Sequence, residues 1–313
     1  MRITVLAGGV GAARFLRGVL AAFPDADIAV IGNTADDIWL HGLKICPDLD
    51  TVMYTLGGGI DPDRGWGRSQ ETYGVLEELR AYDFDPLWFT LGDRDIATHL
   101  VRTQLLSGGF PLSEITDALC RRWQPGVRLL PMTDDRVETH VVVREDDSRR
   151  AMHFQQWWVQ HRAQLPAEEF RFIGVDESRP APGVLEAIGR ADVVVLPPSN
   201  PVVSIGPILA VPGIRAAVEQ GPAPVVGVSG IIGGRPVKGM ADTCLAVIGV
   251  PATAAAVAEH YGPRGHGGIL DGWVHETGDE PPATIPRNLA TSTLMTDQES
   301  AATLAEQAVG LVL

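Results

Sequence analysis

Short apolar segments that alternate with amphipathic helical segments restrict the fold of this chain more than any other feature of its sequence. A strand that is apolar on both sides must be covered on both faces, as in parallel sheets flanked by helices. Helical segments such as ARFLRGVLAAF (13–23), VLEAIGRA (184–191) and GIRAAVEQ (213–220) fit that arrangement. The pattern predicts an α/β fold with a doubly wound, mostly parallel, Rossmann-like sheet. Its expected strands are ITVLA (3–7), IAVIG (28–32), FRFIGV (170–175), DVVVLP (192–197) and PVVGVS (224–229).

The segment from residue 69 to residue 165 has a different, mainly helical character. We interpret it as an insertion with a small β-hairpin, and residues 1–68 with 166–313 as the nucleotide-binding body. The proline-rich segment 278–290 is expected to be a surface loop before a last helix at 296–310. Within the insertion we expect helices in SQETYGVLEELRAY, DIATHLVRTQLLSGG and LSEITDALCRRW, an antiparallel pair of VRLLPM with ETHVVVRE, and a helix in FQQWWVQHRAQL.

Charge and cysteine content exclude several classes of protein. The formal net charge of −14 disfavours a nucleic-acid partner, which needs a basic face, but it permits a small anionic nucleotide. Cys46, Cys120 and Cys244 are odd in number and widely spaced, which indicates a reducing compartment rather than a disulfide scaffold or a structural zinc site. No apolar run reaches the roughly 18 residues of a membrane span, and the N-terminal run is too short for a signal peptide. We therefore expect a cytoplasmic protein without a membrane partner.

The first apolar run ends in a glycine-rich turn, GGVGAARF. Gly8, Gly9 and Gly11 let the backbone turn tightly before a helix, so that its N–H groups can point at a phosphate. A dinucleotide fingerprint would need a glycine where Arg14 stands, and Asn33 replaces the acid that binds ribose in NAD proteins. The G-K-[ST] of a Walker A loop is absent. A turn without a ligand is the alternative, but Arg14, one helical turn in, favours a phosphate loop of another type.

Carboxylates gather directly after the second apolar run, in NTADDIWLHGLKICPDLD. Because the carboxyl ends of parallel strands meet at one edge of the sheet, Asn33, Asp36 and Asp37 are expected beside the glycine turn. Two carboxylates that face a phosphate need a divalent cation, and Mg²⁺ commonly uses one or two carboxylates with substrate phosphates. The alternative is a helix N-cap at Asp36 or Asp37 before IWLHG. For Asp48 and Asp50, the alternative is turn chemistry after a proline.

The segment LGDRDIATHLVR (91–102) is a second group of polar residues. It places Asp93, Arg94 and Asp95 together, with His99 and Arg102 following at helical spacing. Taken by itself, this pattern favours a structural ion-pair network at the start of a helix over a binding site.

A third polar segment, PPSNPVVSIGPIL (197–209), follows the strand DVVVL at the same edge of the sheet. It offers Ser199, Asn200 and Ser204, whose donors and acceptors suit a base or a ribose. A proline-rich loop with a serine N-cap is the alternative. Trp157 and Trp158 could stack on an aromatic ligand, although a double tryptophan on a helix is more often part of a core.

Together, these motifs resemble one family, the 2-phospho-L-lactate transferases of coenzyme F420 biosynthesis, in the actinobacterial phosphoenolpyruvate-transferring branch. Members of this family transfer a phospho-carboxylate unit from a guanylylated donor to the ribityl hydroxyl of the deazaflavin Fo, with Mg²⁺, and release GMP. The expected donor is enolpyruvyl-diphospho-guanosine in actinobacteria and its lactyl equivalent in archaea. The resemblance extends through GGVGAARF, NTADDIWLHG, CPDLDTVMYTLGGGIDPDRGWG, LGDRDIATHLVR, LLPMTDD, HFQQWWVQHR, PPSNPVVSIGPIL, PVKGMAD and LMTD.

The resemblance implies roles for individual residues. Asp36 and Asp37 would bind the metal and the diphosphate, and Asp50 would orient or deprotonate the acceptor hydroxyl. The expected reaction is an in-line phosphoryl transfer without a covalent enzyme intermediate. The implied phosphate- and nucleotide-binding residues are Gly8, Gly9, Gly11, Arg14, Asn33, Ser199, Asn200 and Ser204, and the implied Fo-binding residues are Asp50, Asp93, Arg94 and His99.

A regulator without enzymatic activity is the rival interpretation. A sister branch, the gluconeogenesis factors, resembles these transferases in fold but binds UDP-sugars. The segments LGDRDIATH and CPDLD are associated with the transferase branch instead. A nicotinamide dehydrogenase is disfavoured by Arg14 and Asn33. From the family we also expect a homodimer.

Overall fold

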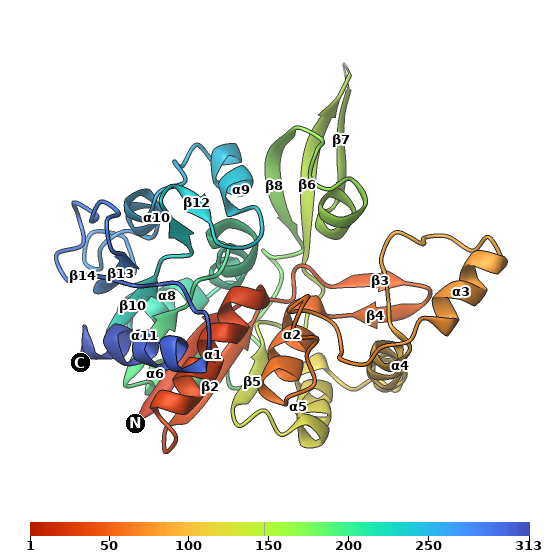
Figure 1. Ribbon diagram of the computed structural model, residues 1–313, viewed down its shortest axis with the longest axis horizontal. Coiled ribbons are helices and arrows are strands. Elements are labelled where there is room, and N and C mark those ends of the chain that lie inside the picture. The colour runs from red at the N-terminus through yellow and green to blue at the C-terminus, as the bar shows by residue number, and fades with distance from the viewer. Residues whose placement is uncertain (147) are drawn as a thin grey trace.

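The computed structural model describes residues 1–146 and 148–313, and its centre is a seven-stranded sheet whose neighbouring strands are all parallel (Figure 1). The order reverses between β1 and β9, the point at which open sheets of this kind bind ligands. The predicted doubly wound α/β fold is confirmed. In spatial order the strands are β5 (Arg128–Pro131), β2 (Asp27–Gly32), β1 (Arg2–Ala7), β9 (Val193–Leu196), β10 (Val225–Val228), β13 (Gly272–Glu276) and β14 (Asn288–Thr291).

Two apolar cores form on the two faces of this sheet, because successive side chains of a strand point to opposite faces. Ile3 and Val5 of β1 belong to one core, and Leu6 belongs to the other. The core of Ile3 is closed by α1 (Gly9–Ala22), α2 (Pro47–Leu56), α5 (Leu112–Trp123) and α11 (Gln298–Gly310). The core of Leu6 is closed by α6 (Val184–Arg190), α7 (Gly206–Ala210), α8 (Ile214–Gln220), α9 (Ala241–Val247) and α10 (Ala254–Tyr261).

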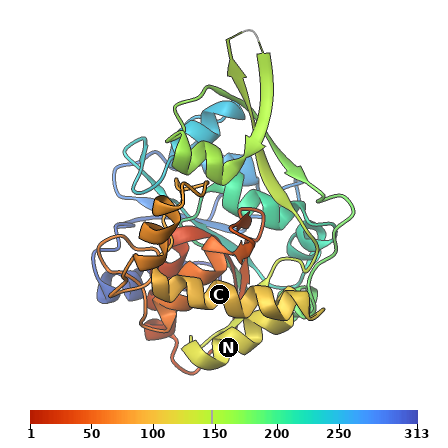
Figure 2. The ribbon, with the colours of Figure 1, turned by 90° about the vertical axis from the view of Figure 1, so that its right-hand side faces the viewer.

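A separate three-stranded antiparallel sheet projects from the body (Figures 1 and 2). It consists of β6 (Glu138–Glu145) between β7 (Ser148–His153) and β8 (Ala167–Ile173). The expectation that FRFIGV forms a central strand is wrong, since this segment lies in β8. β8 carries Glu168, Glu169 and Arg171, and Glu168 pairs with Arg144 of β6 and Arg149 of β7, which suits an exposed sheet.

Two further expectations within the insertion are corrected by the structure. VRLLPM does not pair with ETHVVVRE, because β5 is the edge strand of the central sheet beside β2. FQQWWVQHRAQL forms only a short π-helical turn, η1 (Gln156–Gln160). The division into a body (1–68 with 166–313) and an insertion (69–165) stays a prediction. Strand β5 of the insertion pairs with β2 of the body, and β8 of the body pairs with β6 of the insertion.

The segment after β2 forms a hairpin instead of a helix. β3 (Ile38–Leu40) and β4 (Leu43–Ile45) are antiparallel, and the turn residues His41 and Gly42 have φ of 52° and 76°. The helix N-cap alternative for Asp36 and Asp37 is therefore wrong. Asp48 and Asp50 lie in the first turn of α2, not in an isolated turn.

The remaining elements extend this framework. α3 (Gly74–Ala81) and α4 (Asp93–Ser107) lie beyond the hairpin, and α4 packs beside α5 (Figure 2). β11 (Ile231–Ile232) and β12 (Arg235–Pro236) form a second small hairpin, and η2 (Pro201–Ile205) leads into α7. β13 and β14 were not predicted.

In the described part of the chain, no single helix is both long and apolar enough to cross a membrane. Only the sharply bent pair of Pro201–Ala210 and Ile214–Gln220 reaches that length and hydrophobicity when the two helices are taken together.

The first and last helices pack against each other through a glycine. α1 and α11 lie side by side in Figure 1, and a methyl group on Gly18 would lie 2.2 Å from the carbonyl oxygen of Ala301. Backbone therefore contacts backbone at this point, and the residue in α1 can only be glycine without a shift of the two helices.

We predict opposite effects for the same substitution at two helical glycines. Gly18→Ala should lower the free energy of unfolding by about 1–3 kcal/mol, because the methyl group overpacks the contact with α11. Gly189→Ala in α6 is the matched control, since nothing lies within 4 Å of the added methyl group. It should raise the free energy of unfolding by about 0.5–1 kcal/mol through helix propensity. Urea unfolding of both variants measures this, and equal shifts would contradict the close helix contact.

Candidate active site

A cavity of about 470 Å³ opens at the carboxyl ends of β1 and β9. Its walls are the glycine turn before α1, the loop after β9 and the segment that contains β11 and β12. The sequence-predicted residues that line it are Gly8, Gly9, Gly11, Arg14, Asp36, Ser199, Asn200 and Ser204. The other predicted residues, Asn33, Asp37, Asp50, Asp93, Arg94 and His99, lie outside its lining.

The glycine turn leaves the start of α1 open to this cavity. Gly9 has a φ of 73°, a left-handed conformation that favours glycine, and a methyl group on Gly11 would lie 2.1 Å from the carbonyl oxygen of Pro198. The loop after β9 is tied to the turn by Ser199, whose hydroxyl donates to the carbonyl of Gly8 at 2.9 Å. The N-cap residue Gly8 makes no side-chain cap, and the backbone of Gly9 donates to the carboxylate of Asp48. The other N–H groups of the first turn can bind an anion.

Four aspartates beside this turn are almost completely buried. Asp36, Asp37, Asp48 and Asp50 are 5%, 1%, 8% and 4% exposed, respectively. A buried carboxylate is costly unless a cation or hydrogen-bond donors compensate it. The partners of each carboxylate therefore indicate its role.

Asp37 is paired with a lysine inside the protein. The β3–β4 hairpin brings Lys44 back beside it, with 3.2 Å between Nζ and Oδ2, and the thiol of Cys46 donates to the same oxygen at 3.0 Å. Burial raises the pKa of Asp37, although the charge of Lys44 opposes this. The ring of His153 donates to the carbonyl oxygen of Asp37 at 3.1 Å, because a carbonyl can only accept.

Asp50 is paired with an arginine inside the protein. Arg102 of α4 is 1% exposed, binds the Asp50 carboxylate, and places its other nitrogen 3.1 Å from Nδ1 of His99. Since the guanidinium can only donate, His99 Nδ1 accepts, and the ring proton of the neutral imidazole lies on Nε2. That nitrogen faces Asp95 Oδ1 at 3.5 Å, which also accepts from the hydroxyl of Tyr54 at 2.7 Å.

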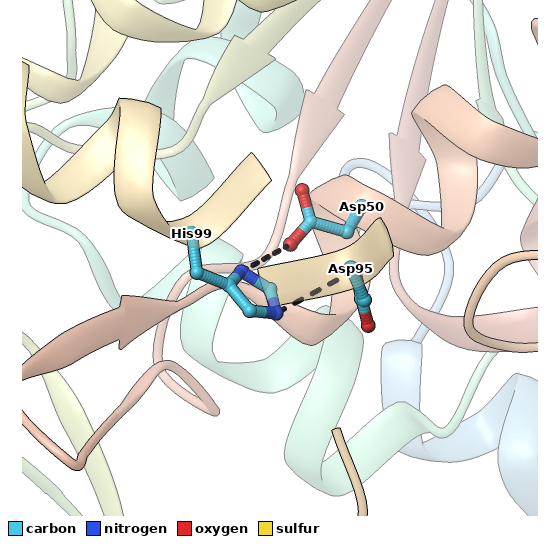
Figure 3. A group of neighbouring side chains, drawn as sticks. All are labelled: Asp50, Asp95 and His99. Atoms are coloured by element: carbon cyan, nitrogen blue, oxygen red, sulfur yellow. Dashed lines mark ion pairs between the residues drawn. The ribbon is translucent and has the colours of Figure 1, made fainter. Parts of the chain in front are cut away.

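Asp50, Asp95 and His99 form a possible metal-binding group. One ligand atom from each lies within 4.8 Å of the others, and Figure 3 shows the imidazole of His99 between the two carboxylates. Burial would raise the pKa of Asp95, but the hydrogen bonds from His99 and Tyr54 outweigh it and leave that pKa below its usual value.

Asp36 and Asp48 have no ion-pair partner among the described residues. Asp48 accepts from the amide of Asn33 at 2.9 Å and from the backbone of Gly9, whereas Oδ1 of Asp36 is buried without a hydrogen-bond partner within the described residues. Burial, reinforced by the charge of Asp48, raises the pKa of Asp36 well above its usual value. Burial also raises the pKa of Asp48 to about 6, against the hydrogen bonds from Asn33 and Gly9. Both carboxylates line the cavity.

Helix geometry explains why Asp48 lines the cavity and Asp50 does not. Residues two positions apart in a helix point in nearly opposite directions. In α2, Asp48 therefore faces the glycine turn, and Asp50 faces α4. The sequence shows both carboxylates in PDLD, but not which one faces the ligand.

Two predicted acceptor residues have structural contacts. Asp93 accepts from the hydroxyl of Thr72 and from the backbone N–H groups of Gly74 and Val75, and so fixes the start of α3. Arg94 donates to the side chain of Gln70 at 3.2 Å. Their predicted role in binding Fo remains a prediction.

The two tryptophans considered for stacking differ in the structure. Trp158 lines the cavity, whereas its neighbour Trp157 is fully buried and donates to the carbonyl of Leu165. The cavity residues that received no role from the sequence include Asp48, Arg64, Trp66, Phe154 and Lys238. A charge or a ring in a loop gives no sequence signal of the direction in which it points.

Comparison with known proteins gives one consistent result. The protein-family model described as 2-phospho-L-lactate transferase CofD matches residues 3–309. The chain is 61% identical to the phosphoenolpyruvate transferase of Streptomyces coelicolor, covering 99% of this chain and 98% of that protein. It is 59% identical to the phosphoenolpyruvate transferase of Thermobifida fusca and 55% identical to that of Mycolicibacterium smegmatis, with at least 98% of each chain covered.

A crystal structure of a UPF0052 family member from Bacillus halodurans has a similar fold. It has a TM-score of 0.64 and 18% sequence identity, and 98% of each chain is covered. At this identity the similarity concerns the fold alone.

We predict that Asp48→Asn stabilises the metal-free protein at high pH. The folded pKa of Asp48, about 6, exceeds its ordinary value of 3.8, so the wild type loses stability as the pH rises through this range. The variant lacks this ionisable group and should be more stable than the wild type by about 2–3 kcal/mol at pH 8, but by only about 1 kcal/mol at pH 4.5. Urea unfolding in the presence of a chelator measures both.

Asp27→Asn is the matched control for this measurement. Asp27 is exposed at the amino end of β2, so its substitution should change stability little at either pH. A gain from Asp48→Asn that is equal at both pH values would contradict the raised pKa.

Proposed function

The chain belongs to the 2-phospho-L-lactate transferase CofD family, and from this premise we propose that it transfers a phosphoenolpyruvyl group in coenzyme F420 biosynthesis. The proposed donor is enolpyruvyl-diphospho-guanosine, the acceptor is the ribityl hydroxyl of Fo, and the products are GMP and dehydro coenzyme F420-0. The names of the relatives at 55–61% identity favour the enolpyruvyl over the lactyl donor. A cytoplasmic location and a homodimer are part of the proposal.

One observation carries the site assignment: Asp36 and Asp48 line the cavity beside the start of α1, and neither has an ion-pair partner among the described residues. Two carboxylates repel the diphosphate of a nucleotide, whereas the N–H groups of α1 attract it. The carboxylates and the diphosphate can lie close together only when a divalent cation lies between them. A diphosphate substrate bound with a metal ion therefore suits this cavity.

The residues present fit Mg²⁺. Asp36 has a buried oxygen without a hydrogen-bond partner in the described part of the chain, and carboxylate oxygens are the ligands that Mg²⁺ prefers. We propose Asp36 and Asp48 as its ligands. Asp37, predicted from the resemblance, would have to leave Lys44 to reach the ion. When bound, the ion would neutralise charge on the diphosphate and on the leaving GMP.

The group of Asp50, Asp95 and His99 suits Mg²⁺ less well. Arg102 already binds the carboxylate of Asp50, and its charge would repel a second cation. We propose that Asp50, which links α2 to α4 through Arg102, helps to orient the acceptor Fo. Asp93, Arg94 and His99 remain predicted neighbours of Fo.

The chain's own residues then hold the two substrates in line. Gly8, Gly9 and Gly11 provide backbone donors for the phosphates, and Ser199 and Asn200 provide polar groups for the guanosine. The hydroxyl oxygen of Fo forms a bond to the distal phosphorus while the bond to GMP breaks, GMP leaves with that electron pair, and the hydroxyl proton passes to water. Positioning and electrostatics account for most of such a reaction.

Aromatic side chains in the cavity suit the planar ring of the deazaflavin. Trp66, Phe154 and Trp158 line the cavity, and Trp66 is 45% exposed. Fo absorbs visible light and fluoresces, so titration of the protein with Fo reports binding directly. The regulator alternative predicts binding of UDP-N-acetylglucosamine without a response to Fo.

We predict that Asp36→Asn and Asp48→Asn each lower Mg²⁺-dependent turnover by at least 100-fold, because each removes one proposed ligand. Protein, Mg²⁺ and Fo are incubated with each guanylylated donor in turn, and the product is identified by mass. Asp27→Asn, at the opposite end of β2, should retain wild-type turnover. Turnover within tenfold of wild type in both site variants would reject the metal assignment.

A further inference from the structure

Two basic side chains, Arg14 and Lys238, line the cavity without a carboxylate partner. Neither forms an ion pair with any residue in the ranges 1–146 and 148–313. The chain carries 39 acidic and 25 basic residues, so partners for a basic side chain are abundant on its surface. Two unpaired cations in one cavity therefore indicate a place for an anion.

A third basic residue nearby shows the contrast. Arg64 is bound to Asp61 at 3.0 Å, donates to the hydroxyl of Tyr73 at 2.8 Å, and lies 4.9 Å from the ring centre of Trp66. Its charge is therefore compensated within the protein, and its side chain is fixed in place. Among the described residues, neither Arg14 nor Lys238 has an acidic partner, and Lys238 donates only to the carbonyl oxygen of Arg64.

Lys238 reaches the start of α1 from the opposite wall of the cavity. It follows β12 directly, and its ammonium lies 3.4 Å from the carbonyl oxygen of Arg64. A methyl group on Gly65 would lie 3.3 Å from this ammonium and 3.0 Å from a methyl group of Val10. The ammonium is thus beside the first turn of α1, the helix that carries Arg14.

The two charges act on each other. Burial, followed by the charge of Arg14, lowers the pKa of Lys238. An anion between them would replace this repulsion with two attractions. A guanidinium offers a planar pair of donors and an ammonium offers a compact charge with three donors, and together they suit adjacent phosphate oxygens.

We propose that Arg14 and Lys238 form an anion subsite for the diphosphate of the donor nucleotide. This inference rests on the proposed function and assigns Lys238 as a substrate-binding residue. The diphosphate then has a cation on two sides, the metal ion at Asp36 and Asp48 and the pair of basic side chains at the mouth of the cavity. The segment of β11 and β12 contributes to substrate binding through Lys238.

Binding of GDP, GMP and guanosine to four proteins tests the proposal. Isothermal titration calorimetry is carried out with Mg²⁺ on the wild type, Lys238→Met, Lys238→Arg and the control Arg235→Met. Arg235 lies in the same hairpin, is exposed and does not line the cavity. Because Lys238 is exposed, its variants should fold normally, and circular dichroism checks this.

The expected result is a pattern across ligands and variants. Lys238→Met should weaken GDP binding about tenfold and leave guanosine binding unchanged, because GDP carries the diphosphate and guanosine carries no phosphate. Lys238→Arg should stay within threefold of wild type, and Arg235→Met should bind GDP like wild type. The loss in Lys238→Met should shrink as salt screens the charge.

Three results would overturn the subsite. They are unchanged GDP affinity in Lys238→Met, an equal loss for guanosine, and an equal loss in Arg235→Met, which would indicate a general effect of net charge. Failure of the wild type to bind GDP would instead reject the proposed function, so the two failures are distinguishable.

Discussion

Four buried aspartates lie in the loop after β2 and in the first turn of α2, and among the described residues a cationic side chain pairs with only two of them. Lys44 compensates Asp37, and Arg102 compensates Asp50. The other two carboxylates, Asp36 and Asp48, face the cavity and depend on what enters it. Two neighbouring elements provide the cations for the paired aspartates. The β3–β4 hairpin brings Lys44 to Asp37, and α4 brings Arg102 to Asp50.

The central sheet places opposite charges on opposite walls of one cavity. The order of the strands reverses between β1 and β9, so the loops that follow these strands diverge and leave a crevice. The acidic pair follows β2 and begins α2, whereas Arg14 lies in α1 and Lys238 follows β12. A ligand with one kind of charge would satisfy only one wall. A diphosphate accompanied by a metal ion satisfies both, which connects the fold with the family to which the chain belongs.

The sequence predicted the fold class, because continuous apolar runs and amphipathic helices are direct consequences of burial on both faces of a sheet. It also predicted the glycine turn and the loop after β9 as walls of a site, since both follow central strands. It could not distinguish β5 from a hairpin strand, because VRLLPM is equally apolar in either position. FRFIGV was misassigned for the converse reason: its single charged residue, Arg171, was outweighed by its apolar residues.

Side-chain direction was the main limit at the site. The sequence placed Asp48 and Asp50 together, and only the helical geometry of α2 separates the residue that faces the cavity from the residue that binds Arg102. The same limit applies to Trp157 and Trp158, one in the core and one in the cavity wall. Lys238 lies in a hairpin far along the chain from Arg14, and no local pattern relates the two.

The contact between Gly18 and Ala301 has a consequence for biosynthesis. The helix α1 at the phosphate-binding turn spans Gly9–Ala22, yet its neighbour α11 spans Gln298–Gly310. On the ribosome, the face of α1 that contacts α11 therefore stays uncovered until residue 301 has been made. The packing behind the nucleotide cavity can be completed only after that residue has emerged.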